Sequence, residues 1–370
     1  MQKLRLFQYF WAVNYLSNIV IFVSPIKFIT PNFIACMSSI SQLLKENNPH
    51  EDILAIAGSL GEKENIPTYI VGGYVRDTLL GKSCKDIDIM VEGDGVAFAK
   101  KLARELKVNV TVDYDKFGTA MIPYPDVEIE VATARIEKYR SDSRKPEVTS
   151  STIEEDMSRR DFTINAIAAS LLPSSFGELY DPFGGIKDLQ KGLIITPLDP
   201  DETFSDDPLR MLRAVRFAAQ LEYDVASTIL ESISRNINRL EIVSWERIRD
   251  EIIKSLTTNK PSIAFYLMKE TGLLTHVFPE MDIMSGVETI NGMGHKDVFI
   301  HTLQVVDNAA KLSDKMEIRF AALVHDIAKP PTKQFDTKKG WTFHGHDEIG
   351  RRMLKKVAKR MKLSNNLRDY

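Results

Sequence analysis

Two carboxylates separated by one residue, Asp86 and Asp88, are the residues of this chain best suited to chemistry. They lie in DIDIMV, where apolar residues alternate with acidic ones as they do in a β-strand. Side chains two positions apart on a strand point to the same side of the sheet, so both carboxylates can bind one cation. Such oxygens suit Mg²⁺, which takes one or two protein carboxylates and completes its shell with water and substrate phosphates. The pair therefore predicts a nucleotide-binding metal site for Mg²⁺, with Mn²⁺ as the alternative.

A double glycine, Gly72 and Gly73, precedes this strand in IVGGYVRD. Glycine allows the backbone to come close to a phosphate, and the free N–H groups of the helix that follows point toward it. Arg76 lies in the first turns of that predicted helix, within reach of a phosphate oxygen. A double glycine or a pair of acids alone is usually only a turn or a solvated strand end. In the order strand, glycine turn, helix and acidic strand, they favour a nucleotide site.

A third carboxylate is expected from a neighbouring strand. The segment VEIEVA, residues 127–132, alternates with period two and places Glu128 and Glu130 on one face. Glu130 is the candidate catalytic residue and Glu128 the alternative. That Glu128 and Glu130 only face solvent is an equally supported alternative.

A pair of arginines follows in MSRRDFTINAIAAS, which predicts a helix carrying Arg159, Arg160 and Asp161. Paired arginines are most often bound to acidic neighbours. They can also clamp phosphates bidentately, which arginine does better than lysine. The preceding residues 135–155 are charged and poor in apolar side chains, so they predict a long loop that is either functional or disordered.

A second acidic and basic pair, Asp207 and Arg210, lies in DDPLRMLRAVRFA. Three residues apart at the start of a helix that begins after Pro208, the two share a face. A carboxylate can accept from the exocyclic amine of cytosine or adenine, while a guanidinium donates to a ring nitrogen or carbonyl. The pair could therefore select a base, and an N-cap with a surface ion pair is the structural alternative.

Five segments in this order, GGYVRD, DIDIMV, RRDFTINA, LYDPFGGIKDL and DDPLRMLRAVRFA, resemble the motifs of class II tRNA nucleotidyltransferases, the CCA-adding enzymes, and of bacterial poly(A) polymerases. The resemblance runs from residue 66 to the end, and the first two segments also resemble nucleotidyltransferases of the DNA polymerase β type. It implies that Asp86 and Asp88 hold the metal and that Arg159 and Asp161 contact the sugar and phosphates of the nucleotide. It also implies that Asp207 and Arg210 read the base.

Further residues take their expected roles from the same resemblance. Asp181 falls in the third motif, and ERIRDE resembles a last motif that braces the helices around the nucleotide. The family usually has Glu where this chain has Asp206. Arg160, Arg213 and Arg216 are expected at the nucleotide. Several arginines would supply positive charge for the nucleotide or for tRNA. These are Arg213, Arg216, Arg235, Arg239, Arg247 and Arg249.

Four residues near the end form a second group: His301, His325, Asp326 and His346. They occur in FIHTLQVVDN, FAALVHDIAKP and WTFHGHDEIG, which resemble an HD phosphohydrolase domain. Helix-borne histidines with an adjacent His-Asp can hold a divalent metal that lowers the pKa of a bound water. The family's site uses a further Asp, so this second metal site is expected to be incomplete.

The implied fold is α+β. A DNA polymerase β-like head, with a small mixed sheet and helices, is expected over residues 37–196. A helical neck and body for base selection and tRNA binding follows over 197–285, and an apparently truncated HD-type helical domain over 286–370. Residues 1–36 form an apolar extension, and its apolar run from Phe7 to Val23 is interrupted by polar residues and shorter than the ~20 residues of a spanning helix. We expect that this extension is upstream sequence joined to the protein by an early start and that the domain begins at Met37. The alternative is a targeting or membrane-anchoring leader.

Composition narrows the setting and the partners. The net charge is −3, 44% of residues are hydrophobic and 27% are charged, which is ordinary for a globular protein. Two cysteines give no disulfide framework and favour a reducing, cytoplasmic location. The expected partners are the tRNA 3′ end, CTP and ATP, with no stable protein partner and no membrane unless the extension is native.

Three alternatives to CCA addition remain. The first is a poly(A) polymerase, although such enzymes carry a GRR-type signature after the acidic strand and lack an HD domain. The second is a tRNA nucleotidyltransferase that adds only CC or only A, against which the presence of residues 135–155 counts. The third is an HD-domain phosphohydrolase or nucleotide sensor with a degenerate front half.

Overall fold

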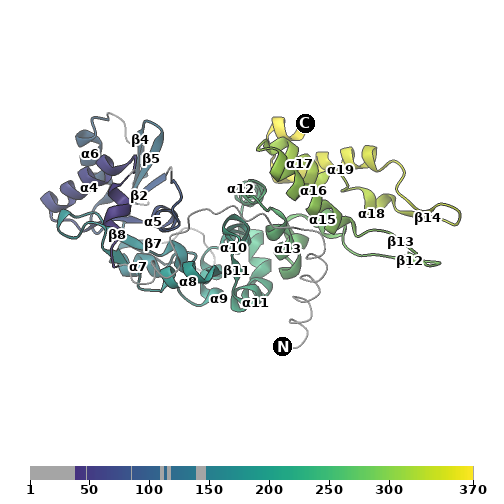
Figure 1. The fold of residues 1–370 in the computed structure, drawn as a ribbon, viewed down its shortest axis with the longest axis horizontal. Helices are drawn as coiled ribbons and strands as arrows, with labels where there is room; N and C mark the ends of the chain where they lie inside the picture. Colours follow the sequence, from purple (N-terminus) through teal and green to yellow (C-terminus); the bar gives the residue numbers. More distant parts are fainter. Residues whose placement is uncertain are drawn as a thin grey trace.

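The computed structural model describes residues 38–46, 48–84, 86–108, 112–114, 118–138 and 147–369. The predicted N-terminal extension lies outside the described residues. The molecule is elongated, with a head that contains the sheet at one end and helices that lead away from it to the C-terminus at the other (Figure 1).

A mixed sheet forms the centre of the head. Its strands are β1 (Thr68–Val71), β2 (Asp86–Val91), β3 (Val112–Tyr114), β4 (Thr119–Tyr124), β5 (Val127–Thr133), β8 (Ala168–Ser170) and β9 (Leu179–Tyr180). They lie in the order β3-β4-β5-β2-β1-β8-β9. Within it β2 and β5 pair in parallel, whereas the other neighbours are antiparallel.

Helices and short turns complete the head. They are α3 (Ser41–Lys45), α4 (Glu51–Glu64), α5 (Gly73–Leu79), α6 (Gly95–Glu105), α7 (Ile153–Ser158) and α8 (Gly185–Lys191), with 3₁₀ turns η2 (Thr163–Asn165) and η3 (Pro173–Ser175). The first two of these helices, α3 and α4, precede β1. The predicted fold class, a mixed sheet with helices followed by a helical remainder, is confirmed.

The two faces of the sheet have different chemistry because the central strands alternate. Ile87, Ile89 and Val91 of β2, with Ile129 and Val131 of β5, are fully or almost fully buried in the core beneath α4 and α6. The intervening residues of both strands carry the acidic side chains on the opposite face. Burial of the apolar set therefore determines which way the carboxylates point.

Two predictions about residues 135–170 were wrong. The charged segment predicted as a loop contains an antiparallel hairpin of β6 (Arg135–Lys138) and β7 (Glu147–Ser150), and residues 139–146 lie outside the described part. The segment from Met157 to Ser170 is not a helix, because α7 ends at Ser158. The Asp161 carboxylate accepts a hydrogen bond from the N–H of Phe162, a local bond that competes with a helix. The chain then enters β8, which pairs with β1.

Beyond the head the chain is mainly helical, as predicted. The neck and body contain α9 (Pro200–Asp206), α10 (Leu209–Leu221), α11 (Ser227–Asn236), η4 (Ile237–Ile242), α12 (Trp245–Leu256), α13 (Ser262–Thr271), α14 (Leu273–Val277) and α15 (Pro279–Asp282), with β10 (Leu193–Ile194) paired to β11 (Asp224–Val225). The last part contains α16 (Val298–Leu312), α17 (Met316–Val324), α18 (Lys329–Thr332), α19 (His346–Met361) and α20 (Asn365–Asp369). Two hairpins accompany these helices, β12 (Thr289–Ile290) with β13 (Met293–Gly294) and β14 (Gln334–Asp336) with β15 (Gly340–Thr342). Among the described residues, none of the helices combines the length and apolar character needed to cross a bilayer.

The contact of α4 with the end of β8 gives a stability prediction. A Cβ at Gly58 would lie 1.8 Å from the carbonyl oxygen of Leu171, a backbone atom that cannot move aside as a side chain can. Alanine favours a helix over glycine by ~1 kcal/mol, but overpacking of this kind costs ~1–3 kcal/mol or more. We therefore expect Gly58→Ala to lower the free energy of unfolding, measured by urea titration. Gly93→Ala is the control, because its Cβ would meet only the Ile66 side chain at ordinary distance. Equal or higher stability of Gly58→Ala would contradict this packing.

Candidate active site

The acidic face of β2 and β5 brings the predicted carboxylates together. The parallel register pairs Asp88 with Glu130 and Asp86 with Glu128. Burial raises the pKa of Asp88, which the nearby Arg160 lowers and Asp86 raises further. Burial raises the pKa of Glu130 as well, and the charge of Asp88 adds to it. Burial and the neighbouring negative charge destabilise the ionised form of these carboxylates, and a bound cation would stabilise it.

The donor set fits a hard divalent metal. Asp86 and Asp88 point the same way from one strand, and Glu130 lies beside Asp88 on the next. Carboxylate oxygens are the ligands that Mg²⁺ takes. The three are not one compact group, however: in the described part of the chain, only the His301 cluster brings three ligand atoms within 4.8 Å of one another.

The glycine turn lies next to these acids. Because β1 runs antiparallel to β2, with Ile70 opposite Ile89, the end of β1 leads to Gly72 beside the start of β2. Gly72 has φ +69°, and a Cβ there would lie 2.7 Å from Nη1 of Arg160. Only glycine gives both this backbone conformation and room for the guanidinium. Arg160 therefore lies between the glycine turn and the carboxylates.

A buried carboxylate that sequence reasoning missed holds both arginines. Asp156 is fully buried near the end of α7 and pairs with Arg159 through Oδ1 and with Arg160 through Oδ2 at 3.3 Å. Arg159 also donates to the carbonyl of Arg135 at 2.9 Å. The spacing of three and four residues on a helix was the available signal. Asp156 fixes where the two guanidinium groups can reach.

Arg76 lies in the first turns of α5, as predicted, with its side chain inside the protein. Its side chain is buried, donates to Asp77 at 2.8 Å and donates to Oδ1 of Asn165 at 2.6 Å. Asn165 in turn donates to Asp161 at 3.0 Å, and its carbonyl accepts from Arg160 at 3.3 Å. In this arrangement Arg76 supports the turn that carries Arg160 and Asp161, and its contact with a phosphate stays a prediction.

Asp161 joins the head to α10. Its Oδ2 accepts from Nε of Arg213 at 2.7 Å, while Oδ1 accepts from Asn165 and the N–H of Phe162. Burial alone would raise the pKa of Asp161, but the charge of Arg213 and these hydrogen bonds lower it to about 2. The carboxylate is thus ionised and fully occupied within the protein.

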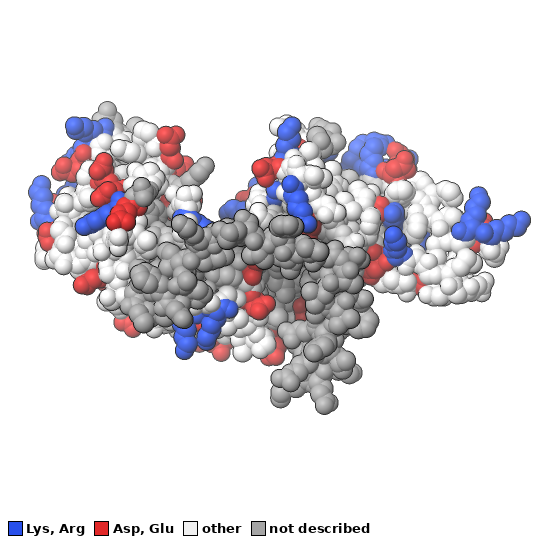
Figure 2. All heavy atoms as spheres, in the orientation of Figure 1, with Lys and Arg blue, Asp and Glu red and all other residues white. Residues whose placement is uncertain are grey.

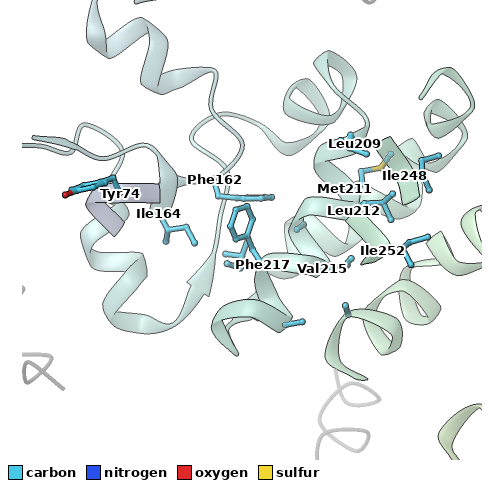
Figure 3. Packing of buried hydrophobic residues seen from close by; sticks show 14 of the residues in the cluster. Tyr74, Phe162, Ile164, Leu209, Met211, Leu212, Val215, Phe217, Ile248 and Ile252 are labelled. Carbon is cyan, nitrogen blue, oxygen red and sulfur yellow. The ribbon is translucent and has the colours of Figure 1, made fainter. Parts of the chain in front are cut away.

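Aromatic rings and arginines form the rest of this junction. Phe162 and Phe217 meet edge to face with centroids 5.7 Å apart, where the head meets α10 (Figure 3). Three guanidinium groups surround the Phe217 ring at 4.0–5.3 Å, those of Arg76, Arg213 and Arg216. Arg216 forms a buried ion pair with Glu251 of α12 at 2.5 Å. Phe217 and Glu251 were not predicted as site residues, although they lie in DDPLRMLRAVRFA and ERIRDE, the segments that resemble family motifs.

The predicted base-selecting residues lie at the start of α10. Oδ1 of Asp207 accepts from the N–H of Leu209 at 3.2 Å, as an N-cap does, and Oδ2 pairs with Arg247 of α12 at 2.8 Å. Arg210 donates to the carbonyl of Arg159 at 2.7 Å. Arg210 of the predicted base-selecting pair is therefore linked directly to Arg159, a predicted phosphate-binding arginine. Arg247 contacts Asp207 as a bracing residue would.

Asp181 of the third motif has a local role. It accepts from the N–H groups of Gly185 at 2.7 Å and Ile186 at 3.0 Å, so it caps the start of α8. Burial raises its pKa. The carboxylate determines how the chain turns from β9 into α8.

The C-terminal group is gathered only in part. Nε2 of His301 and of His325 lie 3.8 and 3.2 Å from Oδ2 of Asp326, and the Lys329 ammonium lies 2.7 Å from the same oxygen. His346 is outside this cluster, with Nδ1 2.9 Å from the carbonyl oxygen of Phe343. Three of the four predicted ligands could hold a cation, and Lys329 already neutralises their carboxylate.

Three family models match parts of the chain. A family model described as "Poly A polymerase head domain" matches residues 68–195. A second, described as "Probable RNA and SrmB- binding site of polymerase A", matches residues 222–284. An HD domain model matches residues 298–369.

Similar proteins agree with the family models. The chain is 35% identical over 316 residues to the Multifunctional CCA protein of Shewanella frigidimarina, covering 81% of this chain and 71% of that protein. It is 34% identical to the A-adding tRNA nucleotidyltransferase of Geobacter sulfurreducens, covering 71% of this chain but 28% of that protein. A solved structure titled Thermotoga maritima CCA-adding enzyme complexed with tRNA is similar at a TM-score of 0.64 and 29% identity, covering 89% of this chain and 70% of that one. Structures titled complexes of CCA-adding enzyme with CTP and with ATP have TM-scores of 0.64 and 0.63, identities of 30% and 29%, and cover 90% and 89% of this chain and 71% of each of those.

The acidic strand pair, the glycine turn and the helical neck define the class of protein, a metal-dependent nucleotidyltransferase. Within this class the chain belongs to the family of class II tRNA nucleotidyltransferases and bacterial poly(A) polymerases.

The ion pair at the head–neck junction predicts a pH dependence of stability. A carboxyl whose pKa falls from 3.8 to about 2 on folding stabilises the folded state above pH ~4, and this stabilisation is lost as the pH falls toward 2. At ~1.4 kcal/mol per tenfold change in proton affinity, it amounts to about 2 kcal/mol. The difference in unfolding free energy between wild type and Asp161→Asn should therefore shrink by about this amount between pH 6 and pH 2.

Urea titrations at several pH values measure this difference. Asp52→Asn, at an exposed position in the first turn of α4, is the matched control. A gap between wild type and Asp161→Asn that does not depend on pH would contradict the assigned pKa.

Proposed function

We propose that this protein adds CMP and AMP to the 3′ end of tRNA from CTP and ATP, without a template and with release of pyrophosphate, and so completes the CCA end. The observation that carries the proposal is the register that places Asp88 beside Glu130, on the open face of the sheet next to Gly72 and Arg160. Relatives named for CCA addition, and similar structures titled as complexes with tRNA, CTP and ATP, support the choice of substrates.

Asp86 and Asp88 would hold Mg²⁺, with Glu130 as the third carboxylate. When bound, such ions lower the pKa of an attacking hydroxyl, here the terminal 3′ hydroxyl, and neutralise the departing pyrophosphate. The residues of the chain complete the site around the nucleotide. Arg160, held by Asp156 between the glycine turn and the carboxylates, would offset phosphate charge beside the metal.

Base selection would come from Asp207 and Arg210. A carboxylate held by Arg247 and a backbone N–H has one defined orientation, so it can accept from an exocyclic amine and reject a carbonyl at the same place. Arg210 contacts the carbonyl of Arg159, so the choice of base and the grip on the phosphates are mechanically connected. This arrangement suits a site that accepts two different bases by small shifts of one pocket.

The alternatives are distinguished by products. A poly(A) polymerase would make long tails from ATP alone. An enzyme like the A-adding relative would add only the final A, and the chain covers 28% of that relative's length. A phosphohydrolase would incorporate nothing, and the Lys329 contact with Asp326 together with the position of His346 does not favour it.

The first activity prediction concerns the acidic pair. Asp86→Asn with Asp88→Asn should lower CMP and AMP incorporation into tRNA lacking CCA by at least ~10³-fold, because metal stabilisation worth several kcal/mol is lost. Binding of that tRNA should change little. Asp126→Asn, at the turn between β4 and β5, is the control. Incorporation close to wild type in the double variant would refute the assignment. Glu130→Gln compared with Glu128→Gln identifies the third carboxylate.

Asp207 is expected to determine which nucleoside triphosphate is incorporated. Asp207→Ala should raise the incorporation of UTP or GTP, relative to that of CTP, by roughly ten- to a hundredfold. One good base contact is worth ~1–3 kcal/mol of discrimination. The rate with an accepted base should fall less than in the Asp86 and Asp88 variant. Single-nucleotide incorporation with each of the four triphosphates measures this. Unchanged selectivity with lowered stability would show that Asp207 is only an N-cap and ion-pair partner.

A further inference from the structure

Positive charge is concentrated in α19 and the residues that follow it. The segment 351–368, RRMLKKVAKRMKLSNNLR, contains no acidic residue, although the whole chain carries a net charge of −3. Figure 2 shows Lys and Arg side chains gathered over α19, at the upper edge of the molecule. Runs of charge are usually solvated faces, so the arrangement of these side chains is what matters.

Part of this charge is neutralised within the protein. Arg351 and Arg352 pair with Glu348, and Arg360 pairs with Glu280. For Lys355 and Lys359, by contrast, the described part of the chain places no carboxylate within ion-pair distance, and both are exposed. They are four residues apart, so they lie on one side of α19.

These lysines line a cavity. It has a volume of about 650 Å³ and lies between the end of α19 and α20. Four of its six lining residues are basic: Lys355, Lys359, Lys362 and Arg368. The other two, Ala358 and Leu363, are small or apolar. The cavity has no aromatic ring and no side-chain acceptor among its lining residues that could read a base, so it suits phosphate groups and not a nucleoside.

The cavity is attached to the base-selecting end of the molecule. The first turn of α12 contacts both: Arg247 pairs with Asp207 at 2.8 Å, while Arg249 donates to the carbonyl of Lys362 at 2.7 Å. Lys362 pairs with Glu246, and the guanidinium of Arg360 lies 5.4 Å from the Trp245 ring. Two residues at the start of α12 therefore contact the predicted base-selecting Asp207 and Lys362 at the basic cavity.

We infer that this cavity binds the sugar-phosphate backbone of tRNA while its 3′ end lies at the carboxylates. The inference rests on the proposed function, which supplies the RNA, and it adds the HD-type part of the chain to the RNA-binding surface. Mobile lysine charges set at several positions match successive phosphates better than one compact triphosphate. Contacts of this kind position the RNA without reading its sequence.

The test removes two charges without altering the helix. Lys355→Gln with Lys359→Gln keeps good helix formers at both positions. The Kd and the KM for tRNA lacking CCA should rise on the order of tenfold at moderate salt, and the slope of log Kd against log salt should fall by roughly 1.5 to 2. The kcat at saturating tRNA and the KM for CTP should not change. The matched control is Lys338→Gln with Lys339→Gln, at the exposed turn between β14 and β15.

The outcomes separate the two hypotheses. Because binding is measured without turnover, weaker tRNA binding in the cavity variant alone supports the inference even if no nucleotide is incorporated, which would refute only the proposed function. Normal incorporation with equal tRNA binding in both variants overturns the cavity as an RNA site. Equal weakening in both variants also overturns it, since general electrostatic attraction would then account for the loss. A change confined to the KM for CTP would show that the cavity binds free triphosphate.

Discussion

The ion pair between Asp161 and Arg213 is the interaction on which the arrangement of the whole site depends. It connects the turn that follows α7 in the head with α10 in the neck. The Asp161 carboxylate is buried, whereas the Arg213 side chain is 32% exposed. Desolvation of Asp161 offsets part of the Coulomb attraction, and breaking the pair is costly because it leaves a buried carboxylate without its partner. Its value here is positional. With Asp161 held by Arg213, the neighbouring Arg159 and Arg160 stand at a defined distance from the start of α10.

The cluster of aromatic rings and guanidinium groups around Phe217 also fixes the position of the head relative to the neck. Three like charges close together would repel one another in a medium of low dielectric. Asp161, Glu251 and Asp77 supply the opposite charges, and the ring face offers a surface for each guanidinium. The head and neck are therefore joined by a polar network with directional contacts. An apolar junction of similar size would tolerate sliding, whereas this one specifies orientation.

The sequence predicted what depends on local pattern and missed what depends on distant pairing. The alternation in DIDIMV and VEIEVA was sufficient to predict two strands with their acids on one face. Only the parallel register shows that Glu130, and not Glu128, lies beside Asp88. The helix predicted through Arg159 failed because β8 pairs with β1, a tertiary contact that overrides local propensity. Asp156 could have been found from helical spacing, but nothing local indicates that three arginines meet at Phe217.

The parallel pairing of β2 with β5 also bears on how the protein folds. The two strands are joined through α6, β3 and β4, so Asp88 and Glu130 meet only after a long loop of chain has closed. Such non-local pairing is slow, because the entropy of closure must be lost before contacts compensate for it. Hairpins such as β4 with β5 can form earlier and locally. The acidic cluster is thus assembled late, and a chain still emerging from the ribosome displays no complete site that could capture metal or nucleotide before the sheet has closed.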